Sequence, residues 1–185
     1  MMKLIILAMS ATMINSILAQ TPVLVKHNSP VLVKATNSSV VAWKKMVNGV
    51  KGYESYKGSS YICCGGKKTI GYGHTGEHVN KRWISEKEAE YILSDELMEY
   101  RDIVLSVVKV PLTPYQLAAL TSFTFNCGRG ALNALVNQPN RLNDGNYDSV
   151  SEIMPMYRRA GGKIRKGLVK RRAWELGLWN NQNDL

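Results

Sequence analysis

Two helix-start signals near the middle of this 185-residue chain limit the folds open to it. Ser85 is followed three residues later by a glutamate, and Thr113 is followed by a proline and, three residues on, by a glutamine. Both arrangements are typical of a capped helix N-terminus. We expect a long amphipathic helix from Ser85 to about Val108, and a second helix from Thr113 that ends near Gly128. A chain with two such helices in succession builds most of its core from helices.

The segment before these helices has a different pattern. Residues 42–53 carry apolar side chains at three- and four-residue steps, which predicts a helix leading to Glu54. Turn-forming residues and short β-type runs follow, around residues 61–62 and 69–72, with a Gly-Gly pair between them. Further helical segments are expected at residues 130–136, 147–157 and 169–177. The predicted fold class is therefore α+β, with one small sheet near the start of a mostly helical domain.

The composition fits one globular domain and adds a strong positive charge. Hydrophobic residues make up 45% of the chain, and no low-complexity tract interrupts it. Twenty-four Lys and Arg residues against fourteen Asp and Glu residues give a formal net charge of +10. Such a surface attracts polyanions, whether nucleic acid, anionic lipid or the acidic polymers of a cell wall. Charge alone leaves these three classes of partner open.

Residues 1–19 have the pattern of a secretory signal peptide. A short positive start is followed by the largely apolar segment Leu4–Ala19 and by small residues suited to cleavage. The apolar segment is shorter than the ~20 residues of a membrane-spanning helix, and polar side chains interrupt it. We therefore expect a secreted protein, extracellular or periplasmic after removal of this segment, without a stable membrane anchor. A transient anchor that is later released is the alternative.

Residues 20–41 are expected to form a leader or linker. The pentapeptide Pro-Val-Leu-Val-Lys occurs there twice, at Pro22 and at Pro30, and each proline favours an extended backbone before it. Two short copies are too few for a repeat architecture. The functional domain is expected to span residues 42–180.

The segment Gly52–Gly76 combines a carboxylate, adjacent cysteines and a histidine, which raises the question of a metal or redox site. Cys63 and Cys64 are neighbours, so they lack both the ligand spacing of a structural zinc site and the Cys-x-x-Cys spacing of a redox pair. Neighbouring cysteines also have the wrong geometry for an easy mutual disulfide. Cys127 is the third cysteine, and a bridge to it from either neighbour stays open. We expect neither a metal nor a cofactor.

The spacing of three polar residues in the same segment is more informative. Glu54 is followed after eight residues by Cys63, and Cys63 after five residues by Thr69, which opens the run Thr-Ile-Gly-Tyr-Gly-His-Thr. This resembles the pattern Glu-x8-(Asp or Cys)-x5-Thr of the phage-type lysozymes, the T4-lysozyme-like endolysins of glycoside hydrolase family 24. Residues 112–132 and 157–179 resemble two further motifs of that family. The resemblance therefore covers nearly all of the predicted domain.

The resemblance implies a lysozyme-like fold in which a small N-terminal β-hairpin sheet lobe and a larger helical lobe flank a cleft. It implies a secreted muramidase that hydrolyses the β-1,4 bond between N-acetylmuramic acid and N-acetylglucosamine in bacterial peptidoglycan and so lyses bacteria. The expected partner is the peptidoglycan glycan strand, not nucleic acid, and we expect a monomer.

Three residues are the candidates for catalysis. Glycosidic cleavage needs a proton donor for the leaving oxygen and a way to handle the attacking water. The resemblance assigns the first task to Glu54 and the second to the hydroxyl of Thr69, with inversion at the anomeric carbon. Cys63 has an open role as a nucleophile, a weak base or a polar spacer, because an unperturbed thiol, with a pKa of ~8.5, is mostly neutral at pH 7.

Substrate binding is expected to involve His74, Asn126 and Gly161, the last in a predicted cleft-side turn. For His74, a structural hydrogen-bonding role is an equally good interpretation. The sequence departs from the family pattern at Ser55, where most members have Gly after the acid, and at Cys64, a position often occupied by Pro. Both departures affect the predicted hairpin rather than the proposed acid.

Two alternative functions remain open. The basic run GGKIRKGLVKRR at residues 161–172 fits a catalytically impaired basic protein that binds the cell wall, or one that holds lipid or nucleic acid. No nucleic-acid-binding fold motif accompanies that run. A lytic transglycosylase would use the same glutamate without water. Thr69 favours a role for water and therefore hydrolysis.

Overall fold

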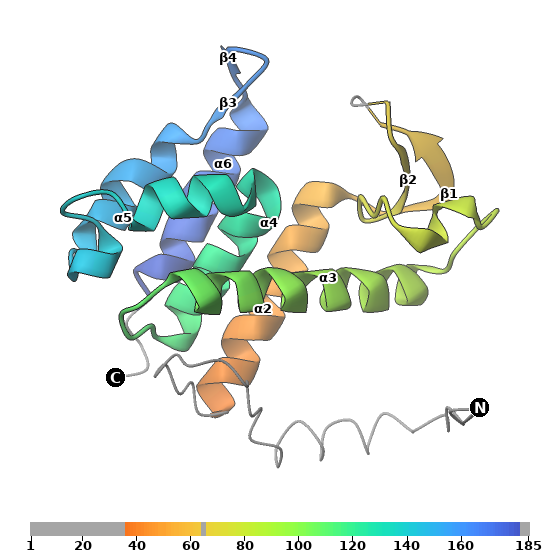
Figure 1. Cartoon of the computed structure of the whole chain (residues 1–185). Coiled ribbons are helices and arrows are strands. Elements are labelled where there is room, and N and C mark those ends of the chain that lie inside the picture. Colours follow the sequence, from red (N-terminus) through yellow and green to blue (C-terminus); the bar gives the residue numbers. More distant parts are fainter. Residues whose placement is uncertain (1–35, 64–65, 182–185) are drawn as a thin grey trace, which may run out of the picture.

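The computed structural model describes residues 36–63 and 66–181 (Figure 1). The predicted signal peptide and most of the predicted leader lie outside the described residues. In the described ranges, no helix is both long and apolar enough to cross a membrane. The elements in chain order are α2 (Asn37–Glu54), β1 (Lys57–Ile62), β2 (Lys68–Gly71), η1 (Glu77–Asn80), α3 (Glu86–Val107), α4 (Pro114–Val136), η2 (Leu142–Asp144), α5 (Asp148–Ile153), η3 (Met154–Met156), β3 (Arg159–Ala160), β4 (Lys163–Ile164) and α6 (Lys166–Trp179).

A small lobe and a large lobe make up the molecule (Figure 1). The hairpin lobe, residues 55–84, contains β1, β2 and η1. The helical lobe contains α2 and residues 108–181, with α4, α5 and α6. The long helix α3 runs from the hairpin lobe to the helical lobe (Figure 1). Small sheets beside a majority of helices confirm the predicted α+β class.

Helix α2 begins earlier than the sequence predicts. The Thr36 hydroxyl accepts a hydrogen bond from Ser39 N at 3.2 Å, and Ser39 Oγ accepts one from Thr36 N at 3.4 Å. This reciprocal pair is a capping box with serine in the place of the usual Glu or Gln. Residues 37–41, which the sequence assigns to the leader, therefore belong to α2.

The two long helices start where the capping patterns place them. Ser85 Oγ accepts a hydrogen bond from Glu88 N at 3.1 Å at the start of α3, while the Glu88 carboxylate pairs with Lys81 instead of closing the box. The box at α4 is complete. Thr113 Oγ1 accepts from Gln116 N at 3.2 Å, and Gln116 Oε1 accepts from Thr113 N at 2.9 Å. Both predicted helix starts are confirmed.

Helix α4 runs further than the sequence predicts. Its helical run extends to Val136, and Gly128 interrupts it with a non-helical backbone of φ 81° and ψ 166°. Glycine adopts a positive φ without the steric cost that a Cβ brings. The predicted helix end near Gly128 is thus a kink, and the separate segment predicted at residues 130–136 continues the same helix.

The predicted hairpin sheet is confirmed as β1 paired with β2 in antiparallel orientation. Tyr61 lies opposite Thr69, and the register shifts between Tyr61 and Lys57. Gly71, at the end of β2, has a φ of 66°, and a Cβ added to it would lie 3.1 Å from Ala89 Cβ on α3. Glycine therefore lets β2 turn sharply while it packs closely against α3.

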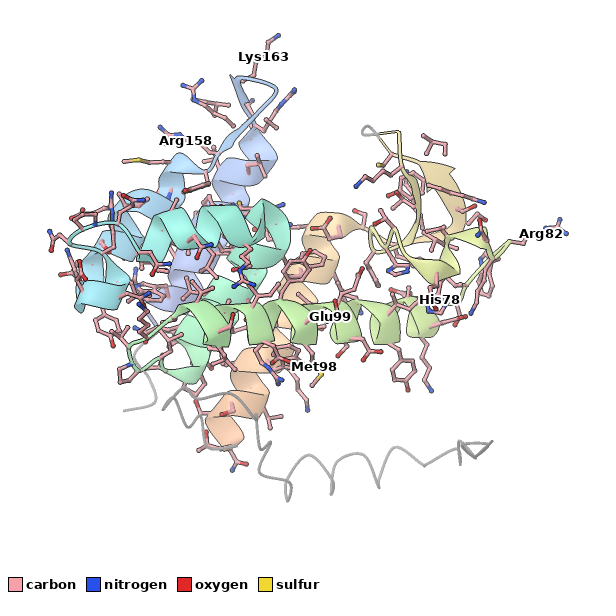
Figure 2. The ribbon with its side chains drawn as sticks, in the orientation of Figure 1. His78, Arg82, Met98, Glu99, Arg158 and Lys163 are labelled. Carbon is pink, nitrogen blue, oxygen red and sulfur yellow. The ribbon has the colours of Figure 1, made fainter. Side chains whose placement is uncertain are left out.

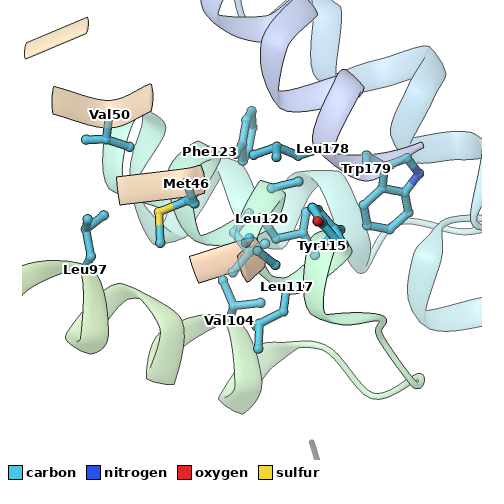
Figure 3. Close-up of a cluster of buried hydrophobic side chains, with 14 of the residues drawn as sticks. Met46, Val50, Leu97, Val104, Tyr115, Leu117, Leu120, Phe123, Leu178 and Trp179 are labelled. Carbon is cyan, nitrogen blue, oxygen red and sulfur yellow. The ribbon is translucent and has the colours of Figure 1, made fainter. Parts of the chain in front are cut away.

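The hydrophobic core lies where α2, α3, α4 and α6 meet (Figure 3). Met46, Leu97, Leu120 and Leu178, one from each helix, are at most 1% exposed. Burial of one such side chain contributes about 1.5–3 kcal/mol to folding. This packing holds α2 firmly against the other helices, and α2 ends at Glu54.

Candidate active site

A pocket of about 300 Å³ opens where the hairpin lobe, α3 and the helical lobe meet. Its walls come from the end of α2, the turn after β2, the middle of α3 and the middle of α4. The lining residues are Glu54, Tyr72, Gly73, Thr75, Glu96, Tyr100, Phe125 and Asn126. Two of the predicted site residues, Glu54 and Asn126, therefore come together from different helices.

Glu54 is the last residue of α2, and its side chain is 25% exposed in the pocket wall. Arg171 donates a hydrogen bond from Nη1 to Glu54 Oε1 at 2.5 Å. A Cβ added to Gly73 would lie 3.7 Å from the other oxygen, Oε2. The bare backbone at Gly73 thus leaves room beside Oε2.

Ser55, the residue after Glu54, has a strained backbone. Its φ is 60° and its ψ is 133°, a conformation that residues with a Cβ rarely adopt. The family pattern that the sequence resembles has glycine here, and glycine takes this conformation without strain. Strain of this kind costs about 1–3 kcal/mol. The chain accepts that cost where it turns out of α2 directly after the carboxylate.

Arg171 also belongs to a buried ion-pair network. The buried carboxylate of Glu175 accepts hydrogen bonds from Arg171 Nε at 3.3 Å and Arg172 Nη2 at 2.9 Å. Ser122 Oγ on α4 donates to the same carboxylate at 2.7 Å. Burial raises the pKa of the Glu175 carboxyl, and Arg172 and Arg171 offset part of that effect. Buried charges are tolerated only when paired, so the network favours one arrangement of α6 on α4.

Arg172 extends the network to the opposite wall of the pocket. It donates from Nη2 to Asn126 Oδ1 at 3.0 Å and from Nη1 to Cys127 Sγ at 2.7 Å. Burial raises the pKa of the Cys127 thiol, and the nearby Arg172 opposes that rise. Cys127 is a free thiol, so the bridge that the sequence left open is not present among the described residues. The guanidinium thereby orients the amide of Asn126 at the pocket.

Cys63 and Thr69 approach each other on the hairpin. Cys63 N and Thr69 Oγ1 both donate to the carbonyl oxygen of Lys67, at 2.9 and 3.0 Å. Thr69 is 2% exposed, and Cys63 is half-buried. Neither is among the described residues that line the pocket. The fold thus brings these two predicted residues together around one carbonyl, apart from the pocket lining that contains Glu54.

His74 connects the hairpin lobe to α3. Its Nδ1 lies 2.9 Å from Glu96 Oε1, and its Nε2 accepts a hydrogen bond from Gly76 N at 3.1 Å. In a neutral ring with this arrangement Nδ1 carries the proton and donates it to Glu96. The contacts order the turn that contributes Gly73 and Thr75 to the pocket wall. They fit the structural interpretation of His74.

Gly161 lies in the turn between β3 and β4, where its φ is 57°. It is exposed and is not among the described residues that line the pocket. Its role in substrate binding stays a prediction. Within residues 36–63 and 66–181, no cluster of three or more His, Cys, Asp or Glu side chains is arranged to hold a metal ion.

The site lies within a segment that matches a known family. Residues 51–175, more than half of the chain, match the family model described as Phage lysozyme. The chain belongs to the phage lysozyme family. The match includes both ends of the buried network, Glu54 and Glu175.

Several endolysins match the chain at moderate identity. The chain is 38% identical over 136 residues to the endolysin of Bacillus phage B103, which covers 72% of this chain and 51% of that endolysin. It is 36% identical over 115 residues to the SAR-endolysin of Escherichia phage Mu, which covers 62% and 67% of the two chains. The chain thus spans about half the length of the Bacillus phage endolysins B103 and PZA.

Solved structures match the fold. The muramidase domain of SpmX from Asticaccaulis excentricus superposes with a TM-score of 0.66 at 27% identity, covering 74% of this chain and 95% of that domain. A P22 lysozyme mutant superposes with a TM-score of 0.63 at 28% identity, covering 72% and 94%. These likenesses confirm the lysozyme-like fold that the sequence motifs predict.

The sequence interpretation gives no role to five of the pocket residues, Tyr72, Thr75, Glu96, Tyr100 and Phe125. Tyr72, Thr75 and Phe125 nevertheless lie within motifs of the phage lysozyme family, whereas Glu96 and Tyr100 lie outside them. The five residues come from the turn after β2, from α3 and from α4, and no local spacing connects these three segments. The helical periodicity of α3 and α4 is also compatible with a role for the aromatic residues in the core alone.

The sequence did contain a signal for the pairing of two α6 arginines, Arg171 and Arg172, with Glu175. Arg171 and Arg172 precede Glu175 by four and three residues, the spacing at which side chains meet on one helix face. The sequence interpretation instead places both in the basic run. They are 3% and 1% exposed, so that run is not a uniformly exposed surface.

Proposed function

We propose that this chain is a muramidase that hydrolyses the β-1,4 bond between N-acetylmuramic acid and N-acetylglucosamine in bacterial peptidoglycan. Membership of the phage lysozyme family supports this activity, as does similarity to chains named endolysin and muramidase domain. The position of Glu54 carries the proposal. It stands at the rigid end of α2, in the wall of a pocket between two lobes, with Oε1 bound by Arg171 and Oε2 beside Gly73.

Glu54 acts as the general acid. Because Arg171 binds Oε1, Oε2 beside Gly73 is the oxygen that carries the proton to the leaving glycosidic oxygen. Proton transfer leaves a carboxylate next to the guanidinium, and a charge-assisted hydrogen bond stabilises that product. The reaction therefore ends with an ion pair for which the protein is already organised.

The positioning of the attacking water is assigned to Thr69 on the family resemblance, since Thr69 is buried on β2 and is not among the described residues that line the pocket. Its hydroxyl proton is donated to the Lys67 carbonyl, so toward a water the oxygen of Thr69 offers only lone pairs. A water that donates to Thr69 keeps its own lone pair free for the anomeric carbon. Attack from the face opposite the leaving group inverts the configuration, and the proton that the attacking water gives up passes to solvent. Cys63, held on the same carbonyl, borders this position as a polar spacer.

Digestion of purified peptidoglycan with the full chain tests the proposal. Mass spectrometry of the fragments should find muramic acid at the reducing ends. Glu54→Gln should lower product formation at least about 100-fold, since general acid catalysis contributes about 10²–10⁴-fold. Glu152→Gln, which changes an exposed glutamate on α5, is the matched control and should digest normally.

Two other results would each replace the proposed hydrolase. Anhydromuramic acid ends would indicate a lytic transglycosylase. If the wild type and Glu54→Gln both bind the wall and neither releases product, the protein is a non-catalytic basic wall-binding protein. Glu54→Gln should unfold at the same temperature as the wild type, so that its loss of activity can be assigned to the missing acid and not to misfolding.

We further propose that the protein acts outside the cytoplasm as a monomer, and that its functional domain extends from Thr36, which caps α2, to residue 180 instead of beginning at residue 42. The support for the location is the pattern of residues 1–19, which is typical of a signal peptide. Expression of the full chain in bacteria, followed by mass determination of the protein in soluble and membrane fractions, tests this. A processed soluble chain is expected, and an intact chain held in the membrane would indicate an anchor.

A further inference from the structure

The β3–β4 hairpin carries a positive surface that the proposed hydrolysis does not use. Between Glu152 and Glu175 the sequence contains no acidic residue. We define the basic hairpin surface as the exposed cations on this hairpin and at the start of α6: Arg158, Arg159, Lys163, Arg165 and Lys166. Figure 2 shows Lys163 at the projecting tip of the hairpin, with Arg158 nearer its base. None of these side chains is among the described residues that line the pocket.

The cations are placed close to one another without counter-charges. Arg165 N donates to Arg158 O at 3.0 Å, so these two residues are neighbours across the hairpin. Lys163 lies opposite Ala160, and the alternation along each strand puts Lys163 on the same face as Arg165. Like charges on neighbouring strands repel. The ion pairs among the described residues involve other cations, so no carboxylate there relieves this repulsion.

Aliphatic side chains are exposed among these cations. Met156 is 65% exposed, Ile164 is 51% exposed and Val169 is 41% exposed. The only aromatic residue of the segment 153–170 is Tyr157, which is half-buried. Single-stranded nucleic acids bind through exposed aromatic rings that stack on bases, and this surface has none. Lys and Arg around exposed aliphatic groups are instead typical of proteins that bind the membrane interface.

We propose that the basic hairpin surface docks this chain on an anionic lipid bilayer. The hairpin enters tip first, so that the cations on its two faces bind lipid phosphate groups while Ile164, on the face opposite Lys163 and Arg165, enters the boundary between headgroups and acyl chains. The charge complementarity relieves the repulsion across the hairpin, and burial of the aliphatic groups removes them from water. This binding is independent of the proposed hydrolysis and would hold the pocket close to a membrane that bears the lipid.

Flotation with lipid vesicles tests the charged part of the surface. The full chain should bind vesicles of phosphatidylglycerol and phosphatidylcholine at physiological salt more tightly than vesicles of phosphatidylcholine alone. The triple variant Arg158→Ser, Lys163→Ser, Arg165→Ser should bind the anionic vesicles about 100-fold more weakly, since each cation near such a surface contributes about fivefold. Circular dichroism should find its fold unchanged, because all three side chains are exposed.

A second triple variant provides a control of equal charge. Lys44→Ser, Arg82→Ser, Lys87→Ser removes three exposed cations from α2, the hairpin lobe and α3. It should change vesicle binding less than fivefold, roughly the contribution of a single cation at the surface. All variants keep the same N-terminal segment. The difference in vesicle affinity between the two triple variants therefore measures the contribution of the hairpin cations. Equal losses in both triples would overturn the docking site.

A pair of single variants tests the contribution of the exposed aliphatic side chains to vesicle binding. Ile164→Ser should weaken binding to the anionic vesicles by about tenfold through lost apolar burial. Val41→Ser should leave it unchanged, although Val41 on α2 is 52% exposed, close to the 51% of Ile164. Binding of soluble polyphosphate separates a bilayer from a soluble anionic polymer. If Ile164→Ser leaves vesicle binding unchanged, and the hairpin triple variant loses affinity for polyphosphate as strongly as for vesicles, the surface binds a soluble anionic polymer and the bilayer proposal is wrong.

Discussion

The hairpin lobe and the helical lobe contribute to the same pocket with very different amounts of buried structure. Strand β1 has no buried residue, and β2 buries Thr69, Ile70 and Gly71. In the helical lobe, by contrast, α4 buries every residue from Leu117 to Thr124. An isolated two-stranded hairpin is at best marginally stable in water. The hairpin lobe therefore depends on its packing against α3.

This difference divides the proposed chemistry between a rigid and a deformable support. The acid Glu54 ends a helix anchored by buried Met46 and Val50, and Arg171 ties its carboxylate to the buried network. The water-positioning Thr69 belongs to the thin hairpin. Damage to the helical lobe should therefore lower global stability, whereas damage to the hairpin should lower activity before the domain unfolds.

The largest expected effect lies in the buried network of the helical lobe. Glu175→Gln leaves the buried guanidinium groups of Arg171 and Arg172 without their shared counter-charge and should lower the free energy of unfolding by about 3–5 kcal/mol. Urea denaturation measures the change. Ser122→Ala removes one hydrogen bond to the same carboxylate and should cost about 1 kcal/mol. A smaller loss for the glutamate variant than for the serine variant would contradict the assigned role of the network.

Hydrogen exchange should separate the two lobes directly. The Ile70 amide, which donates to His74 O at 2.9 Å in the hairpin lobe, should exchange through local opening. The Leu120 amide in the core of α4 should need global unfolding. We expect the free energies of exchange to differ by about 2 kcal/mol or more in native-state NMR measurements. Equal protection at both amides would mean that the lobes unfold as one unit.

Relief of the strain at Ser55 should stabilise the junction of the two lobes. Ser55→Gly should raise the free energy of unfolding by about 1 kcal/mol, because removed strain exceeds the added backbone entropy of glycine. Ser59→Gly, on β1 and without a positive φ, is the control and should lower it by about 0.5–1 kcal/mol. Thermal unfolding compares them, and destabilisation by both would argue against strain at Ser55.

The smallest effect concerns a surface ion pair between Lys81, which follows η1, and Glu88 on α3. A hydrogen bond from Lys81 holds the pKa of the exposed Glu88 carboxyl below its ordinary value. A lowered folded pKa gives stability above the unfolded pKa of ~4.3, which is lost as the pH falls through the folded pKa. Lys81→Met should return the pKa of Glu88 toward its ordinary value in an NMR titration. An unchanged titration would mean that the pair is rarely formed, as many surface pairs are.

The sequence by itself determined the features whose signals are local. Ser85 and Thr113 marked the starts of α3 and α4, because a cap needs only a side chain and a backbone amide three residues away. The apolar periodicity of residues 42–53 placed Glu54 at a helix end, and the short β-type runs placed Thr69 on the hairpin. Helix α2 began early because Thr36 and Ser39 cap it in an unusual combination.

Only the tertiary structure decided which side chains meet at the pocket. Glu54 and Arg171 form an ion pair although 117 positions separate them, and Glu96 reaches the pocket from α3. The fold also divides the basic run, since Arg171 and Arg172 on α6 are buried against α4 while Arg165 is exposed. Charge and helical propensity are local properties of the chain. Burial and pairing depend on how α6 packs against α4, which no local pattern of residues records.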